Sequence, residues 1–234
     1  MFEEDEYGKV LEFPPGCNVV DVGGNFGMFS RYAHHRQPEC KVWVFEPIPE
    51  LFHCLLLNAD TENDTLARKA VGDGGGPAEV TLDYLPHYTM LSGLAAVQNM
   101  SLYYGAAIDD TKKAKVEAAF SEAVTCTAPI TTLTEELKGI GIVHVVKIDV
   151  EGMEAAVLAG IDDELWSRIQ QIAIEVHDCG SRIKDTAEDL FSRGFVTTVT
   201  PPKPPSFVIG DEVASWDQGS GLGTSLVYGI RREK

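Results

Sequence analysis

The stretch VVDVGGNFGMFS, residues 19–30, constrains the fold of this chain more than any other part of its sequence. An apolar strand runs into Gly23, Gly24 and Gly27, and an apolar pattern with helical spacing resumes directly afterwards. Glycines at such a junction let a ligand approach the backbone closely, and the first turn of the helix adds free N–H groups. Ligands of open α/β sheets bind at these strand ends, so we expect a ligand site here. A tight turn that merely requires glycine is the alternative.

Strand-like and helix-like segments alternate along most of the chain. The expected strands cover residues 17–23, 40–47, 66–73, 143–152, 170–178, 195–201 and 224–232. The expected helices cover residues 28–36, 49–60, 153–161 and 181–194. Continuous apolar strands bounded by helices are typical of a parallel sheet that is covered on both faces. No helical pattern separates the last two strands, so we expect a doubly wound α/β fold in which one strand of this pair runs antiparallel.

One segment interrupts this alternation after the third strand. A short strand is expected over residues 78–86, and the chain that follows is rich in Tyr and Met before a helix expected over 110–122. Long insertions in α/β folds often form lids or substrate-binding loops, and a peripheral segment that only packs is the alternative. We treat residues 85–125 as a lid-like insertion within a single domain that spans residues 1–234.

The composition disfavours several classes of protein. The formal net charge of −17 argues against a nucleic-acid-binding protein, because phosphate neutralisation requires a basic surface. The five cysteines are scattered and form no CxxC pair, so neither a zinc ribbon nor a disulfide scaffold is expected, and a reducing, cytoplasmic location is the simplest interpretation. No apolar run is long enough to span a membrane, and the acidic start does not resemble a signal peptide.

Two carboxylates indicate which ligand the glycine turn binds. Asp21 stands two residues before the first glycine, where it would repel a phosphate and suit a cationic group. Glu46 closes the second strand, 25 residues after Asp21, and a carboxylate there can accept both hydroxyls of a ribose. The pattern is neither G-x-G-x-x-G nor a P-loop. The ligand that fits carries ribose, adenine and a positive charge but no pyrophosphate, as S-adenosylmethionine does.

Charged side chains also mark the tips of two later strands. In the fourth expected strand of the alternation, Lys147, Asp149 and Glu151 share one side. Charges on a buried strand are costly without partners, so mutual pairing is one explanation for them. Glu175 and His177 share one side at the end of the next strand, so Glu151, Glu175 and His177 are expected to converge. We predict that these three act in catalysis; a structural role for His177 is the alternative.

Three blocks of the sequence resemble one family. VVDVGGNFGMFS, VFEPIPELFHCLLLN and VVKIDVEGMEAAVLAGI are similar to conserved blocks of FkbM-type methyltransferases, a class I S-adenosylmethionine-dependent group. The K-I-D-V-E-G block is intact, whereas Gly24 replaces the alanine customary in the first block. The resemblance covers roughly residues 5–230 and is weakest over 85–125. MLSG at 90–93 and the closing SLVYGIRR also resemble methyltransferase domains embedded in polyketide and peptide synthetases, which is consistent with a domain of a larger synthase.

The resemblance implies a class I methyltransferase fold with a seven-stranded, Rossmann-like sheet whose seventh strand runs antiparallel. It also implies methyl transfer, usually to a hydroxyl oxygen, on a small molecule or a carrier-bound polyketide or peptide intermediate. The cofactor-binding residues implied by the matching motifs are Asp21, Gly23, Gly24, Asn25, Gly27, Glu46, Pro47, Ala70, Val71 and Asp149. The first five would hold the methionine part of the cofactor and Glu46 the ribose. Ala70 and Val71 would contact adenine, and Asp149 would lie close to the methionine end.

A hydroxyl acceptor calls for a base, and His177 is the candidate, since an imidazole titrates near pH ~6.5. Glu151 or Glu175 would fix its tautomer. In a second hypothesis, which we favour less, carboxylates at the two strand tips bind a divalent metal together with His177. The remaining alternatives are N- or C-methylation, an NAD-dependent oxidoreductase and a catalytically silent cofactor-binding domain. The glycine spacing and Asp21 disfavour the oxidoreductase.

Overall fold

The computed structural model describes residues 6–60, 62–86, 89, 92–93, 121–177, 180–201, 208–209, 212–213 and 223–231. Most of the helix expected over 110–122, and most of the expected lid over 85–125, lie outside these residues. The lid and the single-domain organisation therefore stay predictions. The described part forms a seven-stranded sheet, a three-stranded sheet and a two-stranded ribbon.

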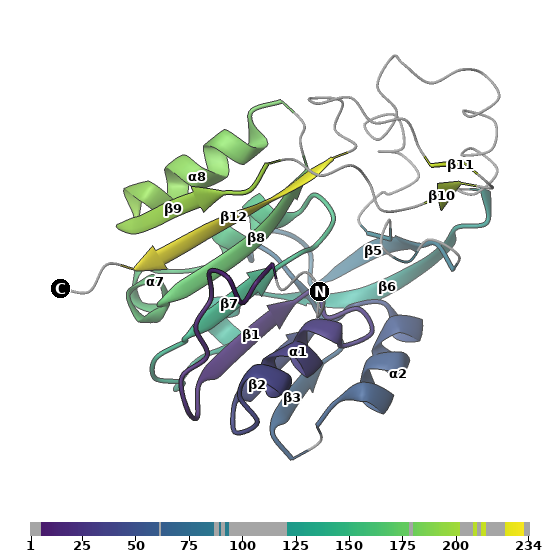
Figure 1. Cartoon of the computed structure of the whole chain (residues 1–234). Helices are drawn as coiled ribbons and strands as arrows, with labels where there is room; N and C mark the ends of the chain where they lie inside the picture. Colours follow the sequence, from purple (N-terminus) through teal and green to yellow (C-terminus); the bar gives the residue numbers. More distant parts are fainter. Residues whose placement is uncertain are drawn as a thin grey trace.

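The seven-stranded sheet has the strand order β3-β2-β1-β7-β8-β12-β9 (Figure 1). Its strands are β1 (Asn18–Val22), β2 (Lys41–Phe45), β3 (Asp64–Ala67), β7 (Val145–Ile148), β8 (Gln171–His177), β9 (Phe195–Val199) and β12 (Thr224–Arg231). β12 runs antiparallel between β8 and β9, whereas the pairs from β3 to β8 are parallel. The predicted doubly wound fold with one antiparallel strand in the last pair is confirmed.

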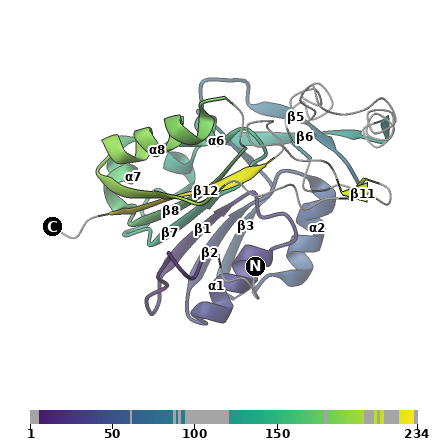
Figure 2. The same cartoon turned by 45° about the horizontal axis from the view of Figure 1, so that its top comes forward.

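Helices cover both faces of this sheet (Figure 2). They are α1 (Met28–Arg36), α2 (Pro49–Asn58), α5 (Leu133–Glu136), α6 (Glu154–Ala159), α7 (Asp163–Arg168) and α8 (Arg182–Ser192). α1 and α2 lie on one face, and α6, α7 and α8 lie on the other. The central strands are apolar on both sides for this reason: Val19 belongs to the core under α1, and Val20 belongs to the core under α6 to α8.

Local sequence signals explain where several helices begin and end. Pro49 occupies the first turn of α2, where its missing N–H costs nothing. Asp162 caps α7, since its Oδ1 accepts a hydrogen bond from the N–H of Leu165 at 2.8 Å. Gly194 follows α8 with φ of +88°, the left-handed conformation in which many helices end and which glycine adopts readily. α7 was not predicted, because its six residues carry too little periodicity.

A second, three-stranded sheet stands beside the main one. It consists of β4 (Ala70–Val71), β5 (Glu79–Tyr84) and β6 (Val124–Thr131) in the order β4-β6-β5. The single strand predicted over 66–73 is wrong, because the chain leaves the main sheet after Ala67 and pairs with β6 at Ala70. β6 was not predicted, and Pro129 within it is a residue that sequence patterns place outside strands. The separate ribbon pairs β10 (Val208–Ile209) with β11 (Glu212–Val213).

The segment before β1 covers the same face of the sheet as α1. Tyr7 and Leu11 are buried in the core with Phe29 of α1. The amide of Gln171 exchanges two hydrogen bonds of 2.8 Å with the backbone of Glu12. These contacts fix residues 6–13 across the sheet, an arrangement that the sequence pattern did not indicate.

Candidate functional site

A cavity opens at the carboxyl ends of β1, β2 and β7, between the main sheet and the small sheet. It encloses about 860 Å³ of empty space when its open mouth is included. The predicted site residues that line it are Gly23, Asn25, Glu46, Pro47, Ala70, Val71, Asp149 and Glu151. Asp21, Gly24, Gly27, Glu175 and His177 do not line it. The structure thus brings most of the predicted residues to one place and sets the others behind the cavity wall.

The glycine turn packs too tightly against its neighbours to carry side chains. A Cβ atom at Gly23 would lie 1.8 Å from the carbonyl oxygen of Asp149, and one at Gly24 would lie 2.3 Å from Cγ1 of Val44. Gly23 also has φ of +81°, and Asn25 follows in the left-handed region at +48°. The N–H groups of Gly23 and Gly24 both donate to the carbonyl of Phe45, at 2.9 and 3.0 Å. Packing and turn geometry therefore account for part of the glycine requirement, and Gly23 also forms part of the cavity wall.

Glu46 is a buried carboxylate held by the backbone. Its Oε2 accepts a hydrogen bond from the N–H of Asn25 at 2.8 Å, and its Oε1 accepts one from Ile48 at 2.9 Å. Burial raises the pKa of Glu46 to about 7, although these two bonds oppose the shift. A carboxylate has about four acceptor positions, so each oxygen keeps one for a ligand in the cavity. The backbone fixes the direction in which those positions point.

Asp21 occupies a supporting position below the cavity. It is fully buried; its Oδ1 lies 3.2 Å from Nζ of Lys147, and its Oδ2 accepts from Ser30 at 3.2 Å. Lys147 also lies 3.4 Å from Oδ2 of Asp149 and donates to the carbonyl of Gly23 at 2.7 Å. We expected Asp21 to face the ligand, but the structure gives that place to Asp149, whose side chain is 31% exposed.

The charges of this buried group depend on one another. Burial lowers the pKa of Lys147, but the charges of Asp21 and Asp149 outweigh it, so the net shift is upward and the ammonium keeps its proton. Burial likewise raises the pKa of Asp21, while the charge of Lys147 opposes the shift. The ammonium therefore joins the first strand of the sheet to the glycine turn and to the cavity wall. The mutual pairing anticipated from the sequence is present.

Glu151 and His177 form a pair at the tips of β7 and β8. Nε2 of His177 lies 3.0 Å from Oε2 of Glu151, and Glu151 has φ of +53°, a strained conformation for this residue. Burial raises the pKa of Glu151 to about 7 against the effect of His177. For His177, burial lowers the pKa, but the bond to Glu151 and the charges of Glu151, Glu154 and Glu175 more than reverse this. The pair is thus set to hold a proton near neutral pH.

Glu175 lies on the same side of β8 as His177 and is also largely buried. Burial raises its pKa to about 7, with further increases from the charges of Asp149 and Glu151, while a hydrogen bond with Thr224 opposes the shift. The three predicted catalytic residues therefore influence one another electrostatically, but only Glu151 reaches the cavity. Among the described residues, no group of three or more His, Cys, Asp or Glu side chains is placed to bind a metal. The part of the chain that is described also contains no helix long and apolar enough to cross a membrane.

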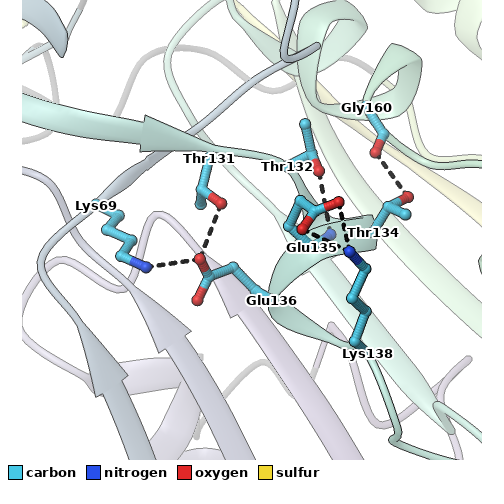
Figure 3. Close-up of polar contacts among 8 residues, drawn as sticks. All are labelled: Lys69, Thr131, Thr132, Thr134, Glu135, Glu136, Lys138 and Gly160. Atoms are coloured by element: carbon cyan, nitrogen blue, oxygen red, sulfur yellow. Dashed lines mark hydrogen bonds and ion pairs between the residues drawn. The ribbon is translucent and has the colours of Figure 1, made fainter. Parts of the chain in front are cut away.

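Polar contacts join Lys69, which lines the cavity, to Glu136 and through it to Thr131 (Figure 3). Nζ of Lys69 lies 2.7 Å from Oε1 of Glu136, and the hydroxyl of Thr131 donates to the same oxygen at 2.8 Å. Lys69 precedes Ala70 directly and lines the cavity itself. These bonds tie Lys69, the residue before β4, and Thr131, the last residue of β6, to Glu136 at the end of α5. Ala70 and Val71 of β4 line the cavity with Ile48 and Leu51. Sequence analysis missed Lys69 and Glu136, which carry no motif.

Other residues of the wall were also missed by sequence analysis. Leu82 and Ile130, from β5 and β6, add apolar surface, and Ser92 and Gly93 lie at its edge. The MLSG block that includes Ser92 and Gly93 was noted for its resemblance to methyltransferase domains, which was the available signal. For Leu82 and Ile130 the signal would have been the pairing of β5 with β6, which the sequence did not indicate.

The chain is similar to known methyltransferases over most of its length. The family model for the methyltransferase FkbM domain matches residues 21–196. The chain is 34% identical over 215 residues to the 31-O-demethyl-FK506 methyltransferase FkbM of Streptomyces tacrolimicus, a match that covers 87% of this chain and 80% of that protein. It is 28% identical over 200 residues to Methyltransferase 1 of Beauveria bassiana, which covers 85% of this chain and 80% of that protein.

Two further comparisons differ in what they cover. The AMB antimetabolite synthetase AmbE of Pseudomonas aeruginosa is 28% identical over 197 residues, which is 76% of this chain and 9% of the synthetase. The crystal structure of a precorrin-6y C5,15-methyltransferase from Geobacter metallireducens aligns with a TM-score of 0.50 at 11% identity, covering 95% of this chain and 84% of that one. At that identity the structural likeness shows the fold alone.

Proposed function

The chain belongs to the FkbM family of S-adenosylmethionine-dependent methyltransferases, and from that premise we propose that it methylates a hydroxyl oxygen of a small molecule in a natural-product pathway. The family excludes the NAD-dependent oxidoreductase that the sequence left open. The relative from Streptomyces tacrolimicus is named for a 31-O-demethyl substrate, which supports oxygen as the acceptor atom. The acceptor of this chain is part of the proposal.

The cavity fits the cofactor by the chemistry of its walls. The free acceptor positions on Glu46 suit the ribose hydroxyls, and the apolar surface of Ile48 and Val71 suits adenine. Asp149 is a partly exposed carboxylate on the cavity wall, which suits the cationic methionine end. The cofactor supplies a methyl group on a sulfonium when it is bound. We propose that Gly23 and Asn25 contact its methionine part, while Asp21, Gly24 and Gly27 support the turn from behind.

The His177–Glu151 pair is the feature of the site that supports oxygen as the acceptor atom. A neutral alcohol is a weak nucleophile, so a base within hydrogen-bond reach accelerates its reaction by about 10²–10⁴-fold. Glu151 lies on the cavity wall and His177 lies directly behind it, 3.0 Å away. The pair accepts the hydroxyl proton, with Glu151 nearest the acceptor and His177 sharing the proton. Glu175 and Glu154 add negative charge that stabilises the protonated pair.

The test of this proposal combines binding with turnover. Calorimetry of the purified chain with S-adenosylhomocysteine measures cofactor binding directly, and incubation with S-adenosylmethionine and a panel of hydroxylated small molecules measures methyl transfer. We expect binding and an O-methylated product, located by mass spectrometry and NMR. Binding without transfer to any acceptor would favour the silent cofactor-binding domain. A methyl group on nitrogen or carbon would overturn the choice of oxygen.

The similarity to a segment of AmbE favours a second form of the acceptor. This match covers 9% of a synthetase, so a related domain occurs within a larger enzyme. We propose as the second candidate that the hydroxyl belongs to an intermediate bound to a carrier protein. The discriminating measurement offers the same hydroxylated acyl group as a free acid and as its carrier thioester. Equal kcat/KM for both forms would dismiss the carrier.

A further inference from the structure

Glu151, the member of the proposed proton-accepting pair that reaches the cavity, stands in a strained turn between β7 and α6. Glu151 has φ of +53°, and Gly152, the next residue, has φ of +99°. A left-handed conformation is unfavourable for a glutamate, so it persists only where its surroundings hold it. The place of Glu151 in the cavity therefore depends on the contacts that hold this turn.

Glu154, the first residue of α6, bonds to the backbone of the turn. Its Oε1 accepts a hydrogen bond from the N–H of Gly152 at 2.8 Å. Glu154 is only 5% exposed, and burial raises its pKa, while the bonds with the N–H of Gly152 and with its own N–H oppose the shift. A buried carboxylate is costly unless hydrogen bonds compensate for its lost hydration. The carboxylate and the turn thus stabilise each other.

The turn separates two hollows of the molecule. Glu151 and Met153 line the cavity, whereas Gly152 and Glu154 line a second hollow beside α6 and α8. Successive residues of the turn therefore face opposite sides. Glu154 acts on the turn from the side away from the cavity, so it can influence the reaction only through the residues that the turn carries.

The contacts on the cavity side act on the side chain of Glu151. Gly93 exchanges two hydrogen bonds with Asp83 of β5, at 2.9 and 3.0 Å, and a Cβ atom at Gly93 would lie 3.3 Å from Cβ of Glu151. The carboxylate of Glu151 meets Nε2 of His177 at 3.0 Å. Both contacts require Glu151 to be in place already. The bond from Glu154, in contrast, acts on the backbone that puts it there.

We propose that Glu154 is a positioning residue, which holds the turn through the N–H of Gly152 and so presents Glu151 to His177 and to the acceptor. This inference rests on the proposed function for its consequence in methyl transfer. The pairing of Glu151 with His177 needs neither cofactor nor acceptor, so it can be measured in the free chain. The positioning role requires the hydrogen bond, whereas the electrostatic effect of Glu154 on His177 requires only the charge.

Two substitutions separate the hydrogen bond from the charge. Glu154→Gln and Glu154→Met both remove the negative charge, but Gln keeps an oxygen that can accept from the N–H of Gly152. Burial lowers the pKa of His177, and Glu151, Glu154 and Glu175 raise it, so both variants should lower this pKa. In Glu154→Met the turn also loosens and the bond to Glu151 weakens. The pKa of His177 should then fall below its value in Glu154→Gln, as measured by NMR titration of the ring protons, which His177→Gln assigns.

Gly152→Ala tests the turn without removing a charge. A Cβ atom there would lie 3.6 Å from Nη1 of Arg182, its nearest neighbour, so there is room for it, but alanine is strained at φ of +99°. We expect the pKa of His177 to fall in this variant as well. Glu164→Gln, on α7, is the control: its side chain is 81% exposed, and the pKa of His177 should stay as in the wild type. Urea unfolding shows which variants fold, and Gly152→Ala decides the matter if Glu154→Met does not.

Turnover supplies a second measurement, made with the acceptor found among the hydroxylated small molecules. At saturating cofactor, kcat should fall by about tenfold to a hundredfold in Glu154→Met, as for a misplaced catalytic group, and much less in Glu154→Gln. The affinity for S-adenosylhomocysteine, measured by calorimetry, should stay as in the wild type in both variants, because Glu154 does not line the cavity.

Three outcomes overturn the inference and leave the proposed function intact. They are an equal pKa of His177 in Glu154→Gln and Glu154→Met, a wild-type pKa in Gly152→Ala, and an equal kcat in the two Glu154 variants. A wild-type chain that binds S-adenosylhomocysteine but methylates no hydroxyl contradicts the proposed function alone, because the titrations use the free chain.

Discussion

The two ends of the cavity hold buried carboxylates in different ways. Burial raises the pKa of Glu46, at the end assigned to the ribose, and of Glu151, at the end assigned to the reaction, to about 7. It does the same for Glu175, which influences Glu151 without lining the cavity. Glu46 receives two backbone N–H groups, whereas Glu151 bonds to His177 and Glu175 stands near other carboxylates. A backbone donor cannot titrate, but an imidazole can. The same burial therefore gives a fixed acceptor at one end and a group that exchanges protons at the other.

Replacing His177 tests the reaction end and has the largest expected effect. In His177→Gln the pair loses its titratable partner, and we expect kcat to fall by about 10²–10⁴-fold, the usual contribution of a general base. The dissociation constant of S-adenosylhomocysteine should change little, because Glu46 and the glycine turn are untouched. Steady-state kinetics and calorimetry measure the two quantities separately.

The dependence of kcat/KM on pH in the wild type provides a second test of the His177–Glu151 pair. The net pKa of His177 is raised, so it is charged below that pKa and accepts a proton only above it. The kcat/KM of the wild type should therefore rise with pH, with a midpoint above the ordinary histidine value of ~6.5. His53→Gln, on the exposed surface of α2, is the control. Near-full turnover of His177→Gln would remove the pair from catalysis.

Lys147 is the cation of the buried group formed with Asp21 and Asp149, and its loss should destabilise the whole fold. In Lys147→Met the carboxylate of Asp21 stays fully buried without its cation. Breaking a buried pair in this way costs about 3–5 kcal/mol. We expect the free energy of unfolding, measured with urea, to fall by that amount. Lys138→Met removes a lysine that is 67% exposed in its ion pair and should change stability by less than about 1 kcal/mol. Equal effects of the two variants would contradict the importance of this buried pair.

The sequence predicted the residues whose place follows from spacing along the chain better than the residues whose place depends on which strands pair. Glu46 was identified because a carboxylate at the end of a second strand has a recognisable spacing from the glycine turn. Asp21 was placed in the wrong layer, because its register opposite Lys147 on β7 appears only when the strands pair. Tyr7 lies in a short acidic segment with no periodicity, so nothing marked it before the fold brought it beside Phe29.

Replacing Glu46 tests the other end of the comparison. Glu46→Gln keeps the shape of the side chain but loses the negative charge of the carboxylate. Two backbone N–H groups donate to that carboxylate, and we propose that the ribose hydroxyls do so as well. We expect the affinity for S-adenosylhomocysteine to fall by about tenfold to a hundredfold, corresponding to ~1.5–3 kcal/mol for a bond to a charged group. The kcat at saturating cofactor should change much less. A large fall in kcat with unchanged affinity would reverse the roles of the two ends.

Titration of Glu46 should make the stability of the fold and the affinity for the cofactor change with pH in opposite directions. Its folded-state pKa of about 7 lies above the ordinary value of ~4.3, so the folded state binds this proton more tightly than the unfolded state does. This contribution to stability is complete below pH ~4.3 and is lost as the pH rises through about 7. Cofactor affinity should instead increase over the same interval, because the carboxylate accepts better than the acid. Both trends, followed by urea unfolding and calorimetry, should be weaker in Glu46→Gln.

The smallest effect is expected at the adenine wall, where the supporting contacts are half exposed. In the pair of Lys69 and Glu136 the side chains are 40% and 21% exposed, so solvent screens the interaction. Glu136→Gln should lower the free energy of unfolding by no more than about 1 kcal/mol. Because Lys69 directly precedes β4, the same change should weaken S-adenosylhomocysteine binding slightly. Glu135→Gln, one residue earlier in the same helix, breaks an exposed pair with Lys138 that does not reach the cavity and should leave binding unchanged. Equal affinity of Glu136→Gln and Glu135→Gln for S-adenosylhomocysteine would show that the contact with Glu136 does not help to position the wall. A loss of affinity in Glu136→Gln as large as that in Glu46→Gln would show that this end of the cavity also depends on a charged side chain.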